Sequence, residues 1–169
     1  MSAALAIRPV ESFDMPVLAG LHAVCFDQAW DQHWSVKSFT EILSMPGAGG
    51  RIAAIGDEPV GFSIARIAAD EAELLLLGTH PGWRRAGHGH ALLAHVLEAL
   101  AASGAKQIYL EVAAPNFPAR AFYRNAGFVQ VGMRPKYYHN MRQAKPAADA
   151  TADALILSRA LVADNLSIK

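Results

Sequence analysis

The stretch that decides the fold runs from Leu77 to Leu93 and reads LGTHPGWRRAGHGHALL. An apolar run ends at Leu77, a Thr-His-Pro-Gly turn follows, and a helical pattern begins after the basic segment from Arg84 to Gly89. A strand that leads through such a loop into a helix makes an anion site, because the first helical amides lack acceptors and the helix dipole is positive there. Gly87 and Gly89 let a phosphate approach the backbone closely. The stretch predicts an α/β fold with an anion-binding loop.

Two common nucleotide-binding motifs do not fit this loop. A P-loop requires GxxxxGK followed by Ser or Thr, and the chain contains no such run. A dinucleotide fingerprint requires a third glycine at the position where Leu92 stands. The loop from Arg84 to Gly89 reads Arg-x-x-Gly-x-Gly instead. The alternative interpretation is an ordinary strand-to-helix turn that carries surface arginines.

Composition predicts one well-packed domain over residues 1–169. Hydrophobic residues make up 53% of the chain and charged residues 18%, which is typical of a folded domain. Lys+Arg and Asp+Glu both number 15, so the chain has no basic excess that would favour nucleic acid or an anionic membrane as a partner. The sequence does not decide the oligomeric state, for which a monomer is the default expectation.

The single cysteine, Cys25, excludes an intrachain disulfide and fits a reducing cytoplasm. It lies in an apolar helical pattern, so we interpret it as a buried hydrophobic residue rather than a nucleophile. The N-terminus lacks a basic segment followed by an apolar run, and we expect no signal peptide. No apolar run approaches the length of a membrane span. We therefore expect a cytoplasmic protein.

Apolar periodicity and turn residues predict an α/β domain in the order β-α-α-β-β-β-α-β-α-β-β. The predicted strands cover residues 5–10, 51–55, 60–68, 72–79, 107–112, 128–133 and 154–160. The predicted helices cover residues 13–25, 35–44, 87–103 and 118–125. Ser12 and Ser35 are the predicted N-caps of the first two helices. Residues 140–151, rich in Ala, Pro and Lys, are a predicted loop.

A second informative stretch runs from Leu110 to Phe128 and reads LEVAAPNFPARAFYRNAGF. Glu111 interrupts an apolar strand, where a carboxylate is costly unless it is paired or faces water. The structural alternatives are an edge-strand or ion-paired role for Glu111 and a helix N-cap role for Asn116. Tyr123 has the alternative of a core residue with its hydroxyl at the surface.

Metal binding and base stacking are not favoured by the remaining motifs. His88 and His90 alternate along a helix and do not share a face, and no Cys or carboxylate completes a known ligand spacing. We therefore expect no metal. The aromatic residues Trp30, Trp34 and Phe39 are better read as a substrate-cleft wall or core packing than as a nucleic-acid surface, because no basic field accompanies them.

Taken together, these motifs resemble the GNAT acetyltransferases over residues 5–161, and within them the ribosomal-protein-alanine N-acetyltransferases. The matching segments are Trp30-x-x-x-Trp34-Ser35, the loop Arg84 to Gly89, Leu110-Glu111-Val112, Asn116, Phe122-Tyr123, Gly127-Phe128 and Tyr137-Tyr138. The resemblance implies a single-domain GNAT-like fold, with a mixed central sheet of about six to seven strands flanked by about four helices. It also implies acetyl-CoA as co-substrate and the N-terminal amine of a protein as acceptor.

The resemblance also assigns residue roles. It implies Glu111 as the catalytic base and Tyr123 as the acid that protonates the leaving thiolate. The residues that it implies for the cofactor are Leu77, Gly78, Thr79, Arg85, Ala86, Gly87, His88, Gly89, His90 and Asn116. The residues that it implies for the acceptor are Trp34, Tyr137 and Tyr138.

Those roles fit the chemistry of acetyl transfer to an amine. An α-amine with a pKa of about 7.7–8.0 is largely protonated at neutral pH, so a base must remove a proton before attack. A strand N–H between Leu77 and Thr79 is placed to stabilise the thioester oxygen as it gains charge. Direct attack needs no covalent enzyme intermediate.

Three departures from the family pattern bear on the acceptor rather than on the cofactor. Ala113 stands where Arg often follows Leu-Glu-Val, Pro115 and Pro118 stiffen the loop around Asn116, and the segment 140–151 is long. A small-molecule amine acetyltransferase and a non-catalytic acyl-CoA-binding module are the alternatives. Retention of both Glu111 and Tyr123 favours an enzyme, because a pure binder needs neither.

Overall fold

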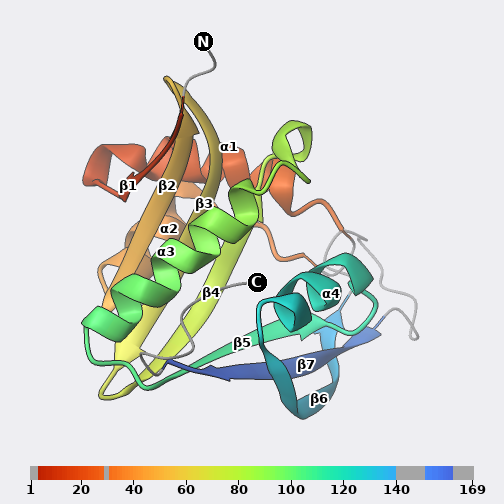
Figure 1. Cartoon of the computed structure of the whole chain (residues 1–169). Coiled ribbons are helices and arrows are strands. Elements are labelled where there is room, and N and C mark those ends of the chain that lie inside the picture. Colours follow the sequence, from red (N-terminus) through yellow and green to blue (C-terminus); the bar gives the residue numbers. More distant parts are fainter. Residues whose placement is uncertain (1–3, 29–30, 140–150, 162–169) are drawn as a thin grey trace.

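A computed structural model describes residues 4–28, 31–139 and 151–161, and in this part of the chain seven strands form one mixed sheet. The strands lie in the order β1-β2-β3-β4-β5-β7-β6 (Figure 1). They are β1 (Leu5–Pro9), β2 (Ala48–Ile55), β3 (Glu58–Ala68), β4 (Glu71–Thr79), β5 (Gln107–Ala113), β6 (Val129–His139) and β7 (Thr151–Ala160). The described helices are α1 (Met15–Cys25), α2 (Val36–Leu43), α3 (His88–Ala102) and α4 (Phe117–Asn125). The predicted fold class and element order are confirmed.

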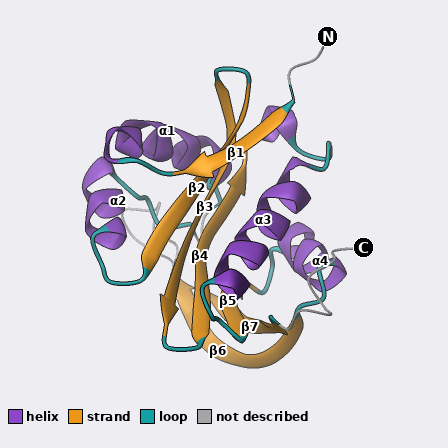
Figure 2. Cartoon of the chain, turned by 60° about the vertical axis from the view of Figure 1, so that its left-hand side comes forward, coloured by secondary structure: helices purple, strands orange, loops and turns teal. Residues whose placement is uncertain are grey.

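Helices cover both faces of this sheet (Figure 2). α1 and α2 pack on one face, around the buried side chains of Leu18, Phe39 and Phe62. α3 and α4 pack on the other face, where Leu93 of α3 and Tyr123 of α4 share one apolar cluster with β5 and β7. Burial of these two clusters supplies the hydrophobic stabilisation that holds the loops between the elements in place.

The sheet opens between β4 and β5, the one parallel pair among the described strands. β4 pairs with β5 only from Glu71 to Glu73, whereas its pairing with β3 continues to Thr79. A bulge in the β3–β4 pairing lies at this point, because Ile64 pairs with Leu76 and Ala65 pairs with Leu74. Bulged strands bend. The carboxyl-terminal half of β4 therefore has a backbone edge on the β5 side that none of the described strands covers.

Several predicted boundaries differ from the structure. β6 continues beyond the predicted end at Met133, because pairing with β7 resumes at Tyr138 after an irregularity at Pro135 and Lys136, where Lys136 has a φ of 51°. The predicted loop 140–151 lies outside the described residues except for Thr151, which begins β7. None of the helices in the described part of the chain is long and apolar enough to cross a membrane.

The N-caps of the first two helices differ in outcome. The Ser35 hydroxyl accepts a hydrogen bond from the Ser38 amide at 3.2 Å, which confirms that cap. The predicted Ser12 cap is wrong, because Ser12 begins a short 3₁₀ turn, Ser12–Asp14, and α1 starts only at Met15. The Asp14 carboxylate accepts from the Glu11 amide at 2.8 Å instead. Asp14 is favoured there because it is also held by Arg8.

A buried carboxylate, Asp14, pairs with the half-exposed Arg8 and fastens the first strand to the start of α1. Nη1 and Nη2 of Arg8 donate to the two carboxylate oxygens at 2.7 and 2.8 Å, and the Asp14 side chain is 3% exposed. The hydrogen bond from Arg8 holds the pKa of Asp14 below its ordinary value. A carboxylate with a lowered folded-state pKa stabilises the fold above its unfolded pKa, and the gain is lost as the pH falls through the folded pKa.

We expect Asp14→Asn to lower the free energy of unfolding by about 1–3 kcal/mol at neutral pH, because the buried Asp14 side chain loses its charge-assisted hydrogen bonds to Arg8. The difference from the wild type should shrink below about pH 4, because Asp14 of the unfolded wild type then takes up a proton while the folded carboxylate, with its lowered pKa, still resists protonation. Urea denaturation at pH 7 and pH 3 measures both values. Asp70→Asn is the matched control, because its pair with Lys106 at 3.1 Å is 54% exposed on the carboxylate side. Equal losses in the two variants would contradict the prediction.

Candidate active site

A cleft of about 780 Å³ opens where β4 leaves β5. Its walls come from the end of β4, the basic loop before α3, the start of α4 and the segment that follows α1. The lining residues are Cys25, Phe26, Asp27, Gln28, Asp31, Leu77, Gly78, Thr79, Arg84, Arg85, Gly87, Gly89, His90, Pro115, Asn116, Pro118, Ala119, Phe122, Tyr123 and Asn125. The cleft therefore joins both informative stretches of the sequence, which lie on opposite sides of the β4–β5 opening.

The basic loop and the first turn of α3 form one wall of this cleft. Gly87 is the N-cap of α3 and has a φ of 85°, a left-handed conformation in which glycine is favoured over other residues. The first intrahelical bond of α3 runs from the Ala91 amide to the Gly87 carbonyl at 3.0 Å. The amides that precede Ala91 in the helix consequently have no acceptor within α3. These amides, the dipole and the neighbouring Arg85 make this wall electropositive.

Arg84 fixes the basic loop to the rest of the cleft. Its Nε donates to the Thr79 carbonyl at 3.1 Å, and its Nη2 donates to the Cys25 carbonyl at 3.1 Å. These bonds join the loop to the end of β4 and to the end of α1. The sequence motif contained Arg84, but the reasoning from sequence assigned it no separate role. Its contacts show that it positions the loop.

Gly89 brings α3 close to β4 and α4. A Cβ atom at Gly89 would lie 3.1 Å from Oγ1 of Thr79 and 3.6 Å from the ring of Phe122. The ring of Phe122 also packs against His90, with 4.6 Å between centroids. Two other predicted cofactor residues, Ala86 and His88, are not among the residues that line the cleft. Ala86 is exposed, and the centroid of the His88 ring lies 5.9 Å from that of Trp83.

Asn116 caps α4 at the edge of the cleft. Its side-chain oxygen accepts a hydrogen bond from the Ala119 amide at 3.2 Å. The N-cap role considered from the sequence is therefore confirmed. This role uses only the side-chain oxygen of Asn116, so it is compatible with a contact between the side-chain nitrogen and a ligand. The oxygen is engaged within α4, whereas the side-chain amide nitrogen is a donor that a ligand in the cleft can use.

Tyr123 projects from α4 into the same cleft and is 8% exposed. Its ring packs edge-on against those of Phe122 and Phe128, at centroid distances of 5.1 and 5.5 Å. Burial raises the pKa of the Tyr123 hydroxyl far above its ordinary value. The hydroxyl consequently stays protonated over the physiological range and can donate a hydrogen bond to a group in the cleft.

Glu111 is positioned by an ion pair, whereas Tyr123 is positioned by aromatic packing. It lies on β5 outside the lining of the cleft, its side chain is 21% exposed, and Nε of Arg134 lies 3.1 Å from its Oε1. The ion-pair alternative considered for Glu111 is therefore present in the structure. Arg134 is a residue that sequence reasoning missed, since it comes from β6, beyond β7 in the sheet order. Only the strand pairing brings the two side chains together.

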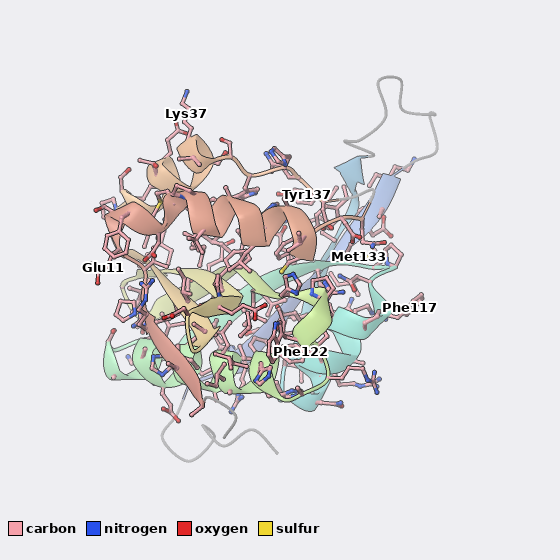
Figure 3. The ribbon with its side chains drawn as sticks, turned by 90° about the horizontal axis from the view of Figure 1, so that it is seen from above. Glu11, Lys37, Phe117, Phe122, Met133 and Tyr137 are labelled. Atoms are coloured by element: carbon pink, nitrogen blue, oxygen red, sulfur yellow. The ribbon has the colours of Figure 1, made fainter. Side chains whose placement is uncertain are left out.

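The predicted acceptor residues separate into two groups. Tyr137, which Figure 3 labels, and Tyr138 both lie on β6, with 5.2 Å between their ring centroids. The guanidinium carbon of Arg134 lies 5.4 Å from the centre of the Tyr137 ring. Burial and the nearby charges of Glu111, Tyr137 and Asp31 raise the pKa of Tyr138 to about 12. Asp31, whose charge acts on Tyr138, is one of the residues that line the cleft.

Trp34 belongs to the core rather than to the cleft lining. Its ring packs against those of Phe39 and His22, at centroid distances of 5.4 and 6.2 Å. Of the alternatives considered for this aromatic group, core packing is the one that describes Trp34. Trp30 lies outside the described residues.

Cys25 lines the cleft, but its thiol is not activated as a nucleophile. Burial raises the pKa of the Cys25 thiol to about 11, so the thiol stays protonated at neutral pH and is a poor nucleophile. Among residues 4–28, 31–139 and 151–161, no three His, Cys, Asp or Glu side chains are grouped so that they could hold a metal ion.

Comparison with known proteins identifies the class. The sequence model of the Acetyltransferase (GNAT) family matches residues 16–128. The [ribosomal protein bS18]-alanine N-acetyltransferase of Escherichia coli strain K12 is 31% identical over 152 residues, which cover 90% of this chain and 95% of that protein. This chain therefore belongs to the GNAT acetyltransferase family. It is an N-acetyltransferase that uses acetyl-CoA.

Solved structures agree with this assignment. The crystal structure of the ribosomal-protein-S18-alanine N-acetyltransferase from Escherichia coli has a TM-score of 0.81 and 26% identity, and the match covers 94% of each chain. Arabidopsis thaliana Naa50 in complex with the bisubstrate analogue CoA-Ac-MVNAL has a TM-score of 0.74 and 23% identity. That match covers 92% of this chain and 97% of Naa50, and it shows the shared fold.

Proposed function

We propose that this protein acetylates the N-terminal α-amine of a protein whose first residue is small, such as alanine. The observation that carries the proposal is the juxtaposition, in one cleft, of an anion-binding helix start, the uncovered edge of β4 and the Tyr123 hydroxyl. The acceptor rests on the relative from Escherichia coli, whose name specifies the alanine of ribosomal protein bS18. The proposed setting is the cytoplasm.

The cofactor half of the cleft fits acetyl-CoA by its chemistry. The α3 amides and Arg85 match a diphosphate, and the uncovered backbone edge of β4 between Leu74 and Thr79 matches an amide-containing chain laid beside it as an extra strand. The Asn116 side-chain amide adds a donor on the opposite wall. Bound acetyl-CoA supplies the acetyl group as a thioester.

The protein's own groups then have separate roles in a direct transfer. Glu111 accepts a proton from the acceptor amine, directly or through a water molecule, so that the nitrogen lone pair can attack the thioester carbonyl. Arg134 holds the carboxylate by Oε1, which leaves the second oxygen to accept that proton. A β4 amide between Leu77 and Thr79 stabilises the charge on the carbonyl oxygen. The Tyr123 hydroxyl donates to the sulfur as the carbon–sulfur bond breaks.

The acceptor is tested by mass spectrometry of products from three substrate classes. We expect acetylation of the α-amine of peptides that begin with alanine, and much slower reaction with N-terminally blocked peptides that contain lysine and with small amines. Acetyl groups found only on lysine side chains or only on small amines would overturn the acceptor assignment and leave the cofactor assignment in place.

The anion site makes a separate prediction at Gly87. Gly87→Asp places a carboxylate beside the diphosphate position, and we expect acetyl-CoA affinity to fall by about 10²-fold or more because like charges repel at close range. A Cβ atom at Gly87 meets nothing within 4 Å, but the φ of 85° strains any side chain at this position, so the variant needs a control that shares the strain. Gly87→Asn is the matched control, because it has the same shape and the same backbone strain without the charge. Calorimetric titration that finds equal affinities for the two variants would contradict the electrostatic role.

A further inference from the structure

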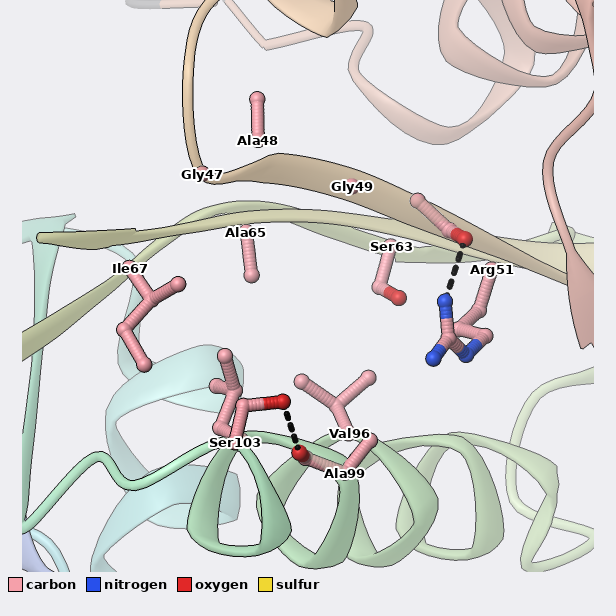
Figure 4. A pocket seen from close by; sticks show the side chains of 12 residues that line it. Gly47, Ala48, Gly49, Arg51, Ser63, Ala65, Ile67, Val96, Ala99 and Ser103 are labelled. Carbon is pink, nitrogen blue, oxygen red and sulfur yellow. Dashed lines mark hydrogen bonds between the residues drawn. The ribbon is translucent and has the colours of Figure 1, made fainter.

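A second cavity lies between α3 and the sheet, towards the end of α3 that is remote from the basic loop (Figure 4). Its volume is about 140 Å³, and β2, β3 and the C-terminal half of α3 form its walls. None of its lining residues lines the acetyl-CoA cleft. The acetyltransferase reaction therefore gives this cavity no role.

One guanidinium supplies all of the charge on the cavity wall. Arg51 of β2 is the only ionisable side chain among the lining residues, so no carboxylate neutralises it there. Its Nη1 donates to the Gly50 carbonyl at 3.0 Å. Its Nε is buried and has no hydrogen-bond partner in the described part of the chain. A buried cationic N–H without an acceptor is costly, and such a group calls for an occupant that supplies one.

Apart from the hydroxyls of Ser63 and Ser103, the rest of the wall is small or apolar. Ala65 of β3 and Val96 of α3 face the space (Figure 4). Leu100 of α3 is also among the lining residues. Ser103 also lines it, but its hydroxyl already donates to the Ala99 carbonyl at 2.9 Å. Ser63 of β3 is the cross-strand partner of Arg51 and also lines the wall. An occupant therefore combines an anionic group for Arg51 and the Ser63 hydroxyl with an apolar body for the remaining surface.

Gly49 leaves the space that such an occupant would fill. A Cβ atom built on Gly49 meets nothing within 4 Å, whereas one on Gly50 would lie 2.8 Å from Val10 and 2.9 Å from Ile64. Because side chains alternate along a strand, Gly49 and Arg51 face the same side of β2 and Gly50 faces the other. The cavity is thus open beside Arg51 because the residue two positions before it has no side chain.

We propose that this cavity is a binding site for a short aliphatic monocarboxylate. The planar carboxylate accepts hydrogen bonds from the Nε edge of Arg51, an arrangement that matches the geometry of a guanidinium. The alkyl tail lies against Ala65, Val96 and Leu100. The volume suits such a molecule, since an apolar cavity of about 150 Å³ accommodates benzene. An inorganic phosphate fits less well, because its remaining oxygens would face apolar groups.

Binding would stabilise the packing of α3 on β2 and β3. A ligand that binds only the folded state stabilises it, and the stabilisation grows with the logarithm of the ligand concentration once that concentration exceeds the Kd. The unfolding temperature rises accordingly. The carboxylate site does not depend on the proposed acceptor or on the proposed catalytic roles. Failure of the carboxylate site would leave the proposed function in place, and failure of the proposed function would leave the carboxylate site in place.

Isovalerate is the probe, isovaleramide is its uncharged counterpart, and saturating CoA keeps both out of the catalytic cleft. We expect saturable binding of isovalerate to the wild type by ¹⁵N NMR titration, with the largest shifts at the amides around Gly49, Arg51 and Ala99. Isovaleramide should bind at least about 10-fold more weakly, because it lacks the charge that Arg51 recognises. Arg51→Gln should weaken isovalerate binding by about 10- to 100-fold.

The Gly49→Val variant distinguishes isovalerate binding in the cavity from binding at any other anion site on the protein. Valine suits a strand and enters open space, so the variant should fold with an unfolding temperature at or above that of the wild type. It should nevertheless lose isovalerate binding while Arg51 is retained. Absence of saturable binding to the wild type would overturn the proposal, and so would unchanged affinity in Gly49→Val. Binding that disappears when CoA is added would assign the site to the cleft and would overturn it as well.

Discussion

Replacement of Glu111 by glutamine should lower kcat by about 10²–10⁴-fold while leaving the affinity for acetyl-CoA close to that of the wild type. Glutamine keeps the shape of the side chain and an oxygen that can accept from Arg134, so β5, β6 and β7 should pack as before. It cannot take a proton from the acceptor amine. The cofactor cleft should be unaffected, because Glu111 is not among its lining residues.

Steady-state kinetics with an N-terminal alanine peptide and calorimetry with acetyl-CoA measure the two quantities separately. The loss should be largest near neutral pH, where most of the amine carries the proton that Glu111 removes. Glu73→Gln is the matched control, because Glu73 is an exposed carboxylate at the paired end of β4 and β5, before the two strands diverge. Turnover of Glu111→Gln within a few-fold of the wild type would rule out the base role.

The anion loop is the part of the site that sequence reasoning located best. The motif from Arg84 to Gly89 is local, and a strand, a glycine-containing loop and a helix start occupy the same short stretch. The same holds for the Ser35 cap, which depends on a residue three positions away. Local geometry is predictable because few alternatives compete with it.

Contacts between distant residues were not predictable in this way. Arg134 meets Glu111 only because β7 lies between β5 and β6 in the sheet, and neither the strand order nor the register is written in the local pattern. The Ser12 cap failed for the same reason, since Arg8 on β1 draws Asp14 into a bidentate pair. The opening between β4 and β5 depends on a bulge in the pairing of β3 with β4.

The sequence also does not show whether an aromatic residue lies in the core or in the cleft. Trp34 and Tyr123 were both equally suited to a core or to a cleft by composition, yet Trp34 packs against Phe39 whereas Tyr123 reaches the cleft. The position of each ring depends on where its helix or loop lies in the fold rather than on the type of residue. The open space beside Arg51 also follows from packing, because Gly49 lies before the predicted strand 51–55 and only the structure places it in β2.

Replacement of Tyr123 by phenylalanine should lower kcat by about 10²-fold or more, with little change in the affinity for either substrate. The variant removes one oxygen and keeps the ring that packs against Phe122 and Phe128. A hydrogen bond to sulfur is needed only as negative charge develops there, so its loss should appear in kcat and in kcat/KM to the same extent. Tyr109→Phe, the same change on β5 outside the cleft lining, is the control and should retain full activity.

The pH dependence of the wild type supplies an independent test of the same role. Because burial raises the Tyr123 pKa well above the ordinary value of 10.0, the hydroxyl keeps its proton through that pH. The activity should therefore show no loss attributable to tyrosine ionisation as the pH rises through 10.0, in contrast to an acid with an ordinary tyrosine pKa. Turnover of Tyr123→Phe equal to that of Tyr109→Phe would exclude the hydroxyl as the donor. An acetyl-CoA affinity that falls together with kcat would instead assign Tyr123 to cofactor binding.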